Sequence, residues 1–262
     1  MMQSRKQIAL VVALLIPVAA VAARSHAAEE VTWTAADGVT LYGDVHTVEA
    51  GKSAPLVLLF HQAGGDARGE YANIIPRLLE AGYNVFAIDQ RSGGSRFENV
   101  NRTVGALEGR DYGYCDAYPD LEAALAQAGK LGFTGPRVAW GSSYSAALVL
   151  RLGAEHAEDL NGVLAFSPAS GGPMAACKAD PFIPKLTLPA LALRPASEME
   201  RDSSRQQFRL FEEHGVQTYV AQNGVHGSSM LDPNRVESDV TATWDVVLEF
   251  LAGAVGDGPA SR

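Results

Sequence analysis

The chain has 262 residues, of which 47% are hydrophobic and 19% charged, so it is long enough to bury one sizeable core and has the size of a single α/β domain. Its formal net charge of −9 at pH 7 opposes binding to nucleic acid and to anionic membrane surfaces. The composition therefore argues against a nucleic-acid-binding protein.

The first 27 residues have the pattern of a secretory signal peptide. Arg5 and Lys6 precede an apolar run of roughly 16 residues, and small residues follow it up to Ala27. The run is shorter than the roughly 20 residues of a membrane-spanning helix, and Pro17 interrupts it. Cleavage near Ala27 removes three basic residues and takes the formal net charge from −9 to −12. We therefore expect a periplasmic or secreted protein without stable membrane association.

Strand signals dominate the next part of the chain, which we expect to form one domain over residues 28–253, followed by a disordered tail over 254–262. Alternating residues around Asp37 and Gly38 predict an antiparallel hairpin, because an Asp-Gly pair supplies the positive φ angles of a tight turn. Short continuous apolar runs then predict parallel strands that are buried on both faces. These runs are "PLVLLF" (55–60), "YNVFAID" (83–89), "RVAWG" (137–141), "GVLAFS" (162–167) and "LPALALR" (188–194), and "QTYVA" (217–221) reads as a further strand.

Helix signals lie between these strands. The candidate helices span residues 71–81, 118–131, 145–152, 205–214 and 237–251. Alternation of strand and helix predicts an α/β fold: a mostly parallel central sheet with an N-terminal antiparallel hairpin, right-handed crossovers, and helices on both faces.

The longest segment without a regular signal runs from residue 90 to 118, after a strand end where clefts form in open α/β sheets. Its arginines are candidates to meet a substrate carboxylate, although they also read as solvated loop charges: Arg91, Arg96, Arg102 and Arg110. In an oxidising compartment the two cysteines, Cys115 and Cys177, are expected to form a disulfide. The bridge would join this loop to the segment after "GVLAFSPASGG".

The stretch "RVAWGSSYSAALVL" predicts a strand that turns sharply into a helix. Such a turn projects its middle residue at the carboxyl end of the strand, and here that residue is Ser143. Ser142 and Ser145 then become packing residues. The pattern is G-x-S-x-S, so that Ser145 stands where a second glycine is usual.

A serine hydroxyl becomes a good nucleophile only when a histidine takes its proton and a carboxylate orients that histidine. Three histidines follow Ser143 in the sequence. His156 and His214 lie at helix ends, whereas His226 lies in a glycine-bounded loop after a strand, which is typical of a functional residue. We therefore predict His226 as the base.

The acid is expected just beyond "LPALALR", where three acidic residues follow one another. Glu198 lies about four residues beyond Arg194 and is the first choice; Glu200 and Asp202 are alternatives, and Asp202 also suits a helix cap.

Backbone N–H groups for a developing oxyanion are expected near "HQAGGD" (61–66), since its glycines let backbone approach a substrate. The candidates are Tyr144 together with Gln62 or Ala63. His61 precedes Ser143 in the chain and is interpreted as a structural histidine.

The stretches "LLFHQAGG", "VFAIDQRSGGS", "DLEAAL", "GSSYSA" and "GVHG" follow one another in the order typical of a known family. On these residues the chain resembles the dienelactone-hydrolase-like serine hydrolases of the α/β-hydrolase fold. The resemblance implies a triad of Ser143, Glu198 and His226 that cleaves a carboxylic ester, a thioester or a small amide of a small-molecule substrate. The sequence departs from the family at Ser145 and at "RPASE", where a glycine followed by the acid is usual. Dienelactone hydrolases proper carry cysteine at the turn, so their substrate is not implied.

No cofactor or metal is expected, because the chain lacks the G-x-G-x-x-G and phosphate-loop patterns and any Cys/His cluster. Two alternatives stay open: a non-catalytic binding protein of the same fold, and a peptidase that uses the same triad. The sequence leaves the oligomeric state open.

Overall fold

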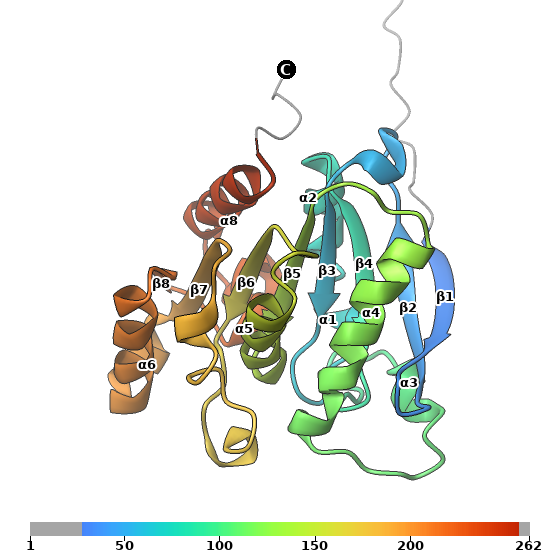
Figure 1. Cartoon of the computed structure of the whole chain (residues 1–262). Helices are drawn as coiled ribbons and strands as arrows, with labels where there is room; N and C mark the ends of the chain where they lie inside the picture. Colours follow the sequence, from blue (N-terminus) through green and yellow to red (C-terminus); the bar gives the residue numbers. More distant parts are fainter. Residues whose placement is uncertain (1–27, 257–262) are drawn as a thin grey trace, which may run out of the picture.

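The hairpin expected near the N-terminus forms one edge of an eight-stranded sheet in the computed structural model, which describes residues 28–256 (Figure 1). The strand order is β1-β2-β4-β3-β5-β6-β7-β8. The strands are β1 (Glu29–Thr34), β2 (Thr40–His46), β3 (Leu56–Phe60), β4 (Asn84–Asp89), β5 (Arg137–Ser142), β6 (Gly162–Phe166), β7 (Ala190–Pro195) and β8 (Gln217–Ala221). The predicted signal peptide over 1–27 and the last six residues of the expected tail lie outside the described residues.

The pairing confirms the predicted fold class. β1 and β2 pair antiparallel, β2 joins β4 antiparallel, and every other neighbouring pair is parallel. β3, β4, β6 and β7 are buried at every position, as continuous apolar runs require when helices cover both faces.

Helices cover the sheet on both sides. α4 (Tyr118–Lys130), α5 (Tyr144–Glu155) and α6 (Asp202–Glu213) lie over the face seen in front in Figure 1, and α1 (Ala67–Glu70), α2 (Ile75–Glu80) and α8 (Thr241–Ala254) lie behind it. Two hydrophobic clusters correspond to these two layers, with Leu121 and Leu148 in the first and Leu78 and Trp244 in the second. The remaining helical segments are short: α3 (Arg102–Gly105), α7 (Pro233–Val236), and the 3-10 turns η1 (Gly51–Ser53), η2 (Tyr114–Ala117), η3 (Gly172–Met174), η4 (Ile183–Lys185), η5 (Ala196–Glu200) and η6 (Gly227–Leu231).

Two of the predicted helices start four residues later in the structure than expected. The helix expected over 71–81 corresponds to α2 alone, since α1 ends before it and residues 71–74 form a turn. α2 starts beside Pro76, which lacks an N–H and therefore suits a first helical turn. The last helix starts at Thr241 rather than at 237, because Glu237 adopts a left-handed conformation and ends α7. It continues to Ala254, one residue into the segment expected as a tail.

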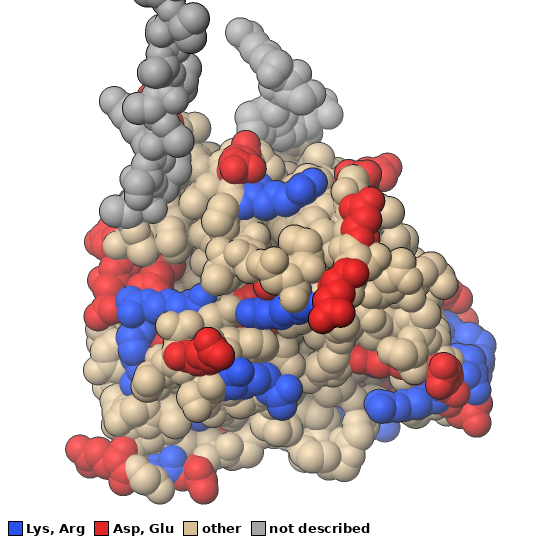
Figure 2. Space-filling view, turned by 180° about the vertical axis from the view of Figure 1, so that it is seen from behind, with Lys and Arg blue, Asp and Glu red and all other residues tan. Residues whose placement is uncertain are grey.

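The face behind the sheet carries mixed charge. Figure 2 shows basic and acidic side chains interspersed across it, so that this face presents no broad basic surface for a polyanion. In the part of the chain that the structure describes, no helix combines the length and the apolar character needed to span a membrane.

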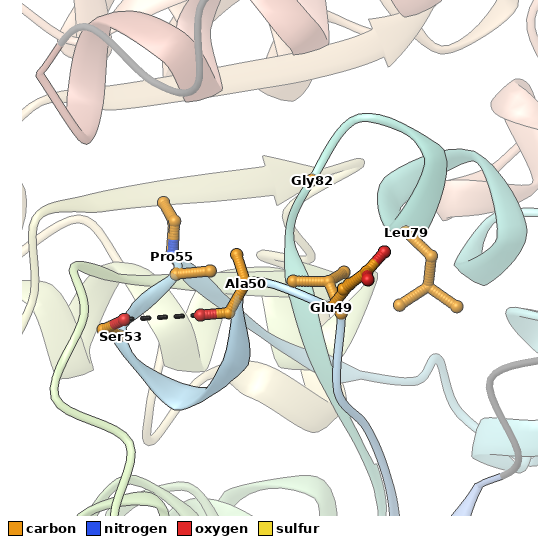
Figure 3. A pocket seen from close by; sticks show the side chains of 8 residues that line it. Glu49, Ala50, Ser53, Pro55, Leu79 and Gly82 are labelled. Carbon is orange, nitrogen blue, oxygen red and sulfur yellow. Dashed lines mark hydrogen bonds between the residues drawn. The ribbon is translucent and has the colours of Figure 1, made fainter.

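A pocket of about 490 Å³ opens at the amino ends of β3 and β4, where Pro55, Leu79 and Gly82 line it (Figure 3). Functional sites of open α/β sheets lie at the carboxyl ends of the strands, and Ser143 follows β5 at that opposite end. This pocket therefore belongs to the other end of the molecule.

Candidate active site

Ser143 is the single residue between β5 and α5, and its backbone conformation is one that few residues adopt. Its φ and ψ are 62° and −114°, which is a strained region for a residue with a Cβ. Backbone hydrogen bonds to the end of the neighbouring strand β6 and to the segment after it hold it: its N–H donates to Phe166 O (2.8 Å), and its carbonyl accepts from Ala169 N (3.1 Å). Gly141 is required at the start of the turn, because a Cβ there would collide with the carbonyl of Ser145. The turn therefore projects Ser143 at the carboxyl end of the sheet.

His226 and Glu198 complete a chain of hydrogen bonds that starts at Ser143. Nε2 of His226 lies 2.8 Å from Ser143 Oγ, and Nδ1 of His226 lies 2.5 Å from Glu198 Oε1. The His226 side chain is 49% exposed, whereas that of Glu198 is only 9% exposed. The His226 ring is thus half exposed to solvent, while the Glu198 carboxylate is held in the protein behind it.

The loop that carries His226 is anchored to the ends of β5 and β6. Gly227 N donates to Ser167 Oγ (3.0 Å), and Ser228 N donates to Ser142 Oγ (2.9 Å). Gly227 has a φ of +69°, and a Cβ there would collide with Ser142 Oγ, so the glycine of "GVHG" is required by both backbone angle and space. Ser142, interpreted from sequence as a packing residue, also fixes the histidine loop.

Glu198 is the acidic residue of its loop that reaches His226. Glu200 is exposed, and Asp202 begins α6 with its side chain 86% exposed and paired with Arg205. Burial raises the pKa of Glu198, but the hydrogen bond and charge of His226 and the charge of Arg194 outweigh burial and lower it below its ordinary value. The carboxylate is therefore ionised at neutral pH.

The loop after β3 (residues 61–66), where oxyanion donors are expected, holds the N–H groups of Gln62 and Ala63 differently. Gln62 N donates to Glu70 Oε2 at 2.6 Å, so this N–H is already committed. The N–H groups of Ala63 and Tyr144 have no acceptor within residues 28–256. Of the expected donors, Gln62 therefore has its N–H bonded to the buried side chain of Glu70, and the N–H groups of Ala63 and Tyr144 stay the candidates.

His61 holds this loop from inside the protein, as expected for a structural histidine. Its Nδ1 donates to Gln62 O (2.8 Å), since a carbonyl only accepts, and its Nε2 accepts from Gln90 N (2.9 Å), since an amide N–H only donates. The two contacts fix the neutral tautomer and orient the peptide that carries the Ala63 N–H.

Ser145, the departure from the usual glycine, connects the Ser143 turn to the loop after β3. Its fully buried Oγ donates to His61 O (2.5 Å) and lies 2.9 Å from the side-chain amide of Gln90. A second glycine could not make either contact. The serine therefore ties the Ser143 turn to the 61–66 loop as well as filling space.

The predicted disulfide is confirmed. Cys115 and Cys177 are bonded with their Cα atoms 5.5 Å apart, and the bond joins η2 to the segment that follows η3. Beside it, Tyr114 stacks on Tyr144 with ring centroids 5.0 Å apart. The bridge therefore holds the 90–118 loop next to Tyr144, which follows Ser143.

Two of the four loop arginines are committed to ion pairs. Arg91 pairs with Asp120 (2.6 Å) and with Asp37, and its side chain is buried. Arg102 likewise contacts three acidic side chains: Asp89 (2.7 Å), Asp44 (2.9 Å) and Glu30 (2.9 Å). Neither guanidinium is therefore free to bind a substrate carboxylate, and neither is a solvated loop charge. Arg96 is exposed beside Gly64, and Arg110 donates to Leu107 O (3.1 Å).

Sequence reasoning missed two contacts of the candidate site, that of Glu70 with the Gln62 N–H and that of Arg194 with Glu198. Arg194 stood in the quoted "LPALALR" run but was counted only as the end of a strand. Within the described residues, no group of three or more His, Cys, Asp or Glu side chains is placed to hold a metal ion.

Residues 51–227 match a family model described as "Serine aminopeptidase, S33". No curated protein matches the chain. Solved structures do resemble it. The esterase Pf2001 of Pyrococcus furiosus is 18% identical, with a TM-score of 0.65, and the match covers 88% of this chain and 92% of that one.

Two further structures have the same architecture. A putative dienelactone hydrolase from Klebsiella pneumoniae is 15% identical with a TM-score of 0.64, over 86% of this chain and 99% of that one. Est1E from Butyrivibrio proteoclasticus, solved with ferulic acid, is 15% identical with a TM-score of 0.64, over 84% and 97% of the two chains. At these identities the likeness establishes the α/β-hydrolase fold.

Proposed function

The chain belongs to the serine aminopeptidase S33 family of hydrolases, and from this premise we propose that it is an exported serine hydrolase that cleaves a carboxylic ester, a thioester or a small amide. The observation that carries the proposal is the unbroken hydrogen-bond chain from Ser143 through His226 to Glu198. A binding protein of the same fold has no need for a strained serine aligned with a histidine and a buried carboxylate, so this geometry favours the enzyme.

In the first half of the reaction, Ser143 Oγ attacks the substrate carbonyl carbon while its proton passes to His226 Nε2. Glu198 accepts the Nδ1–H of the ring and stabilises the imidazolium that forms. The N–H groups of Ala63 and Tyr144 face the developing oxyanion. Collapse of the tetrahedral intermediate breaks the bond to the leaving group, which takes the proton from His226, and Ser143 is left acylated.

In the second half, water attacks the acyl-enzyme carbonyl and gives its proton to His226. The tetrahedral intermediate collapses, the carboxylic acid leaves, and the proton returns to Ser143 Oγ. Each proton is carried by a group that already lies within hydrogen-bond distance of its partner, so the chain's own residues supply the whole relay.

Export is supported by two independent features. The first 27 residues have the signal-peptide pattern, and the Cys115–Cys177 disulfide suits an oxidising compartment.

The test is labelling with a fluorophosphonate probe, followed by a panel of p-nitrophenyl esters of short and long acyl chains and an aminoacyl p-nitroanilide. The probe should label the wild type but neither Ser143→Ala nor His226→Ala, and both variants should lose activity by about 10⁴-fold or more. Ser203→Ala, at an exposed serine of α6, is the matched control and should behave as wild type. Absence of labelling in the folded wild type, or labelling that persists in Ser143→Ala, would overturn the proposal.

A further inference from the structure

A buried arginine lies behind the acid of the proposed triad. Arg194 is in β7, and its side chain is only 6% exposed. Nη1 donates to Glu198 Oε2 at 2.5 Å, and Nη2 donates to Gln207 Oε1 at 2.5 Å and to Pro168 O. A guanidinium in such a place is stable only when it is paired, because burial penalises its charge. The paired group here is Glu198.

The two oxygens of Glu198 are divided between two partners. Oε1 faces His226 Nδ1, and Oε2 faces Arg194 Nη1, both at 2.5 Å. The carboxylate cannot rotate toward either partner without losing the other. From this division we propose that Arg194 is a positioning residue of the catalytic triad, which holds Glu198 ionised and turned toward His226 and limits how readily His226 is protonated. The inference rests on the proposed function only for its consequence for the reaction rate.

The same guanidinium joins three segments around the nucleophile. Glu198 is on η5 and Gln207 is on α6, while Pro168 precedes Ala169, whose N–H donates to Ser143 O (3.1 Å). The "RPASE" departure therefore has a physical explanation. η5 turns the chain back after Pro195 so that Glu198 lies beside Arg194, four residues earlier. Glu198 thus lies on the short helical turn η5 and is paired with Arg194 of the preceding strand, β7.

A cation behind the acid has a definite electrostatic effect. The positive charge of Arg194 already lies beside Glu198 when the Glu198–His226 pair takes up a proton. Protonation of the pair is therefore less favourable than it would be without Arg194. The charge of Arg194 thus helps to keep Glu198 an anionic acceptor for the Nδ1–H of His226. Other charges near the cluster are Arg201, which ends η5 and acts on Arg194, and Asp180, which contacts Gln207 (3.4 Å) and pairs with Lys178 (3.5 Å).

The experiment compares neutral and charged substitutions at one position. Arg194→Met and Arg194→Gln remove the charge, and Gln can keep one hydrogen bond to Glu198, whereas Arg194→Lys keeps the charge. Arg209→Met removes one charge from an exposed position of α6 and is the matched control. Folding is checked by circular dichroism, and Arg194→Gln carries the comparison if the Met variant does not fold.

Two readouts separate this inference from the proposed function. The first is the pKa of the His226 ring, followed by NMR and assigned by its loss in His226→Ala, which requires no catalysis. The second is the pH dependence of kcat/KM with p-nitrophenyl acetate. Both neutral variants should raise the pKa of His226 and the acid limb of the profile by about one pH unit. Arg194→Lys and Arg209→Met should leave both near the wild-type values.

A purely structural role for Arg194 predicts a different result. Activity would then fall by the same factor at every pH, and the pKa of His226 would not move in the folded Arg194→Gln protein. That outcome would overturn the inference. If the probe labelled nothing but the NMR shift were observed, the positioning role would stand and the proposed function would fail.

Discussion

Removal of the disulfide should destabilise the protein more than it slows catalysis. The bond joins residues 62 positions apart, and Cys115→Ala/Cys177→Ala releases that constraint on the unfolded chain. The chain-entropy relation gives a loss of about 4 kcal/mol in the free energy of unfolding at 25 °C for a loop of this length. With an unfolding entropy of about 2.1 cal/mol/K per residue over roughly 230 residues, this corresponds to a fall in Tm of about 9 °C.

The effect on kcat should be less than about tenfold, because the turn that holds Ser143 does not depend on the bridge. Its backbone is fixed by Phe166 O and Ala169 N, while the bridge acts on it only through the stacking of Tyr114 on Tyr144. Stacked aromatic pairs contribute about 0.5–1.5 kcal/mol, which limits the change in rate that their loss can cause.

The assay is urea unfolding of the wild type and the double variant, followed by kcat measurements on both. Wild type under reducing conditions is the control and should match the variant, since it has lost the same covalent link. A decrease of less than about 1 kcal/mol in the free energy of unfolding would refute the reasoning, because it would mean that the unfolded chain gains little freedom when the bond is removed.

Two further predictions concern buried carboxylates. Glu70→Leu leaves the buried Gln62 N–H without an acceptor and frees the 61–66 loop to shift, so kcat should fall by about 10²-fold with little change in KM. Glu70→Gln keeps an acceptor, and its kcat should fall less. Equal kcat values in steady-state assays of the two variants would contradict this role. Burial raises the pKa of Asp44, but hydrogen bonds from Arg68 and Arg102 outweigh burial and lower that pKa below the value of about 3.9 in the unfolded chain. The ionised Asp44 therefore stabilises the folded protein above that pH, and this contribution is lost as the pH falls through the pKa of Asp44 in the folded protein. Urea unfolding between pH 5 and pH 3 should therefore show a loss of stability that is smaller in Asp44→Asn, and identical pH dependence in the two proteins would argue against it.

Local sequence patterns were sufficient to predict the sheet and the nucleophile turn. Continuous apolar runs mark strands that are buried on both faces, and the strands appear at the expected positions. Glycine and serine spacing around Ser143 marks a tight turn, because the backbone at Gly141 has no room for a side chain. These features depend on residues that are close in sequence, so they are readable without the fold.

The contacts of the site depend on residues far apart in the chain, and only the tertiary structure decided them. Glu198, Glu200 and Asp202 lie within five positions of one another, and the curvature of η5 is what turns Glu198 alone toward His226. The Gln62 N–H has an acceptor because α1 brings Glu70 next to the loop after β3. The sequence could not distinguish Arg194 from an ordinary residue at a strand end. Its contact with Glu198, a buried carboxylate that also contacts His226, exists only in the folded chain. Sequence spacing restricts which residues are candidates, whereas the direction of a side chain and the burial of a charge are set by the packing of distant segments.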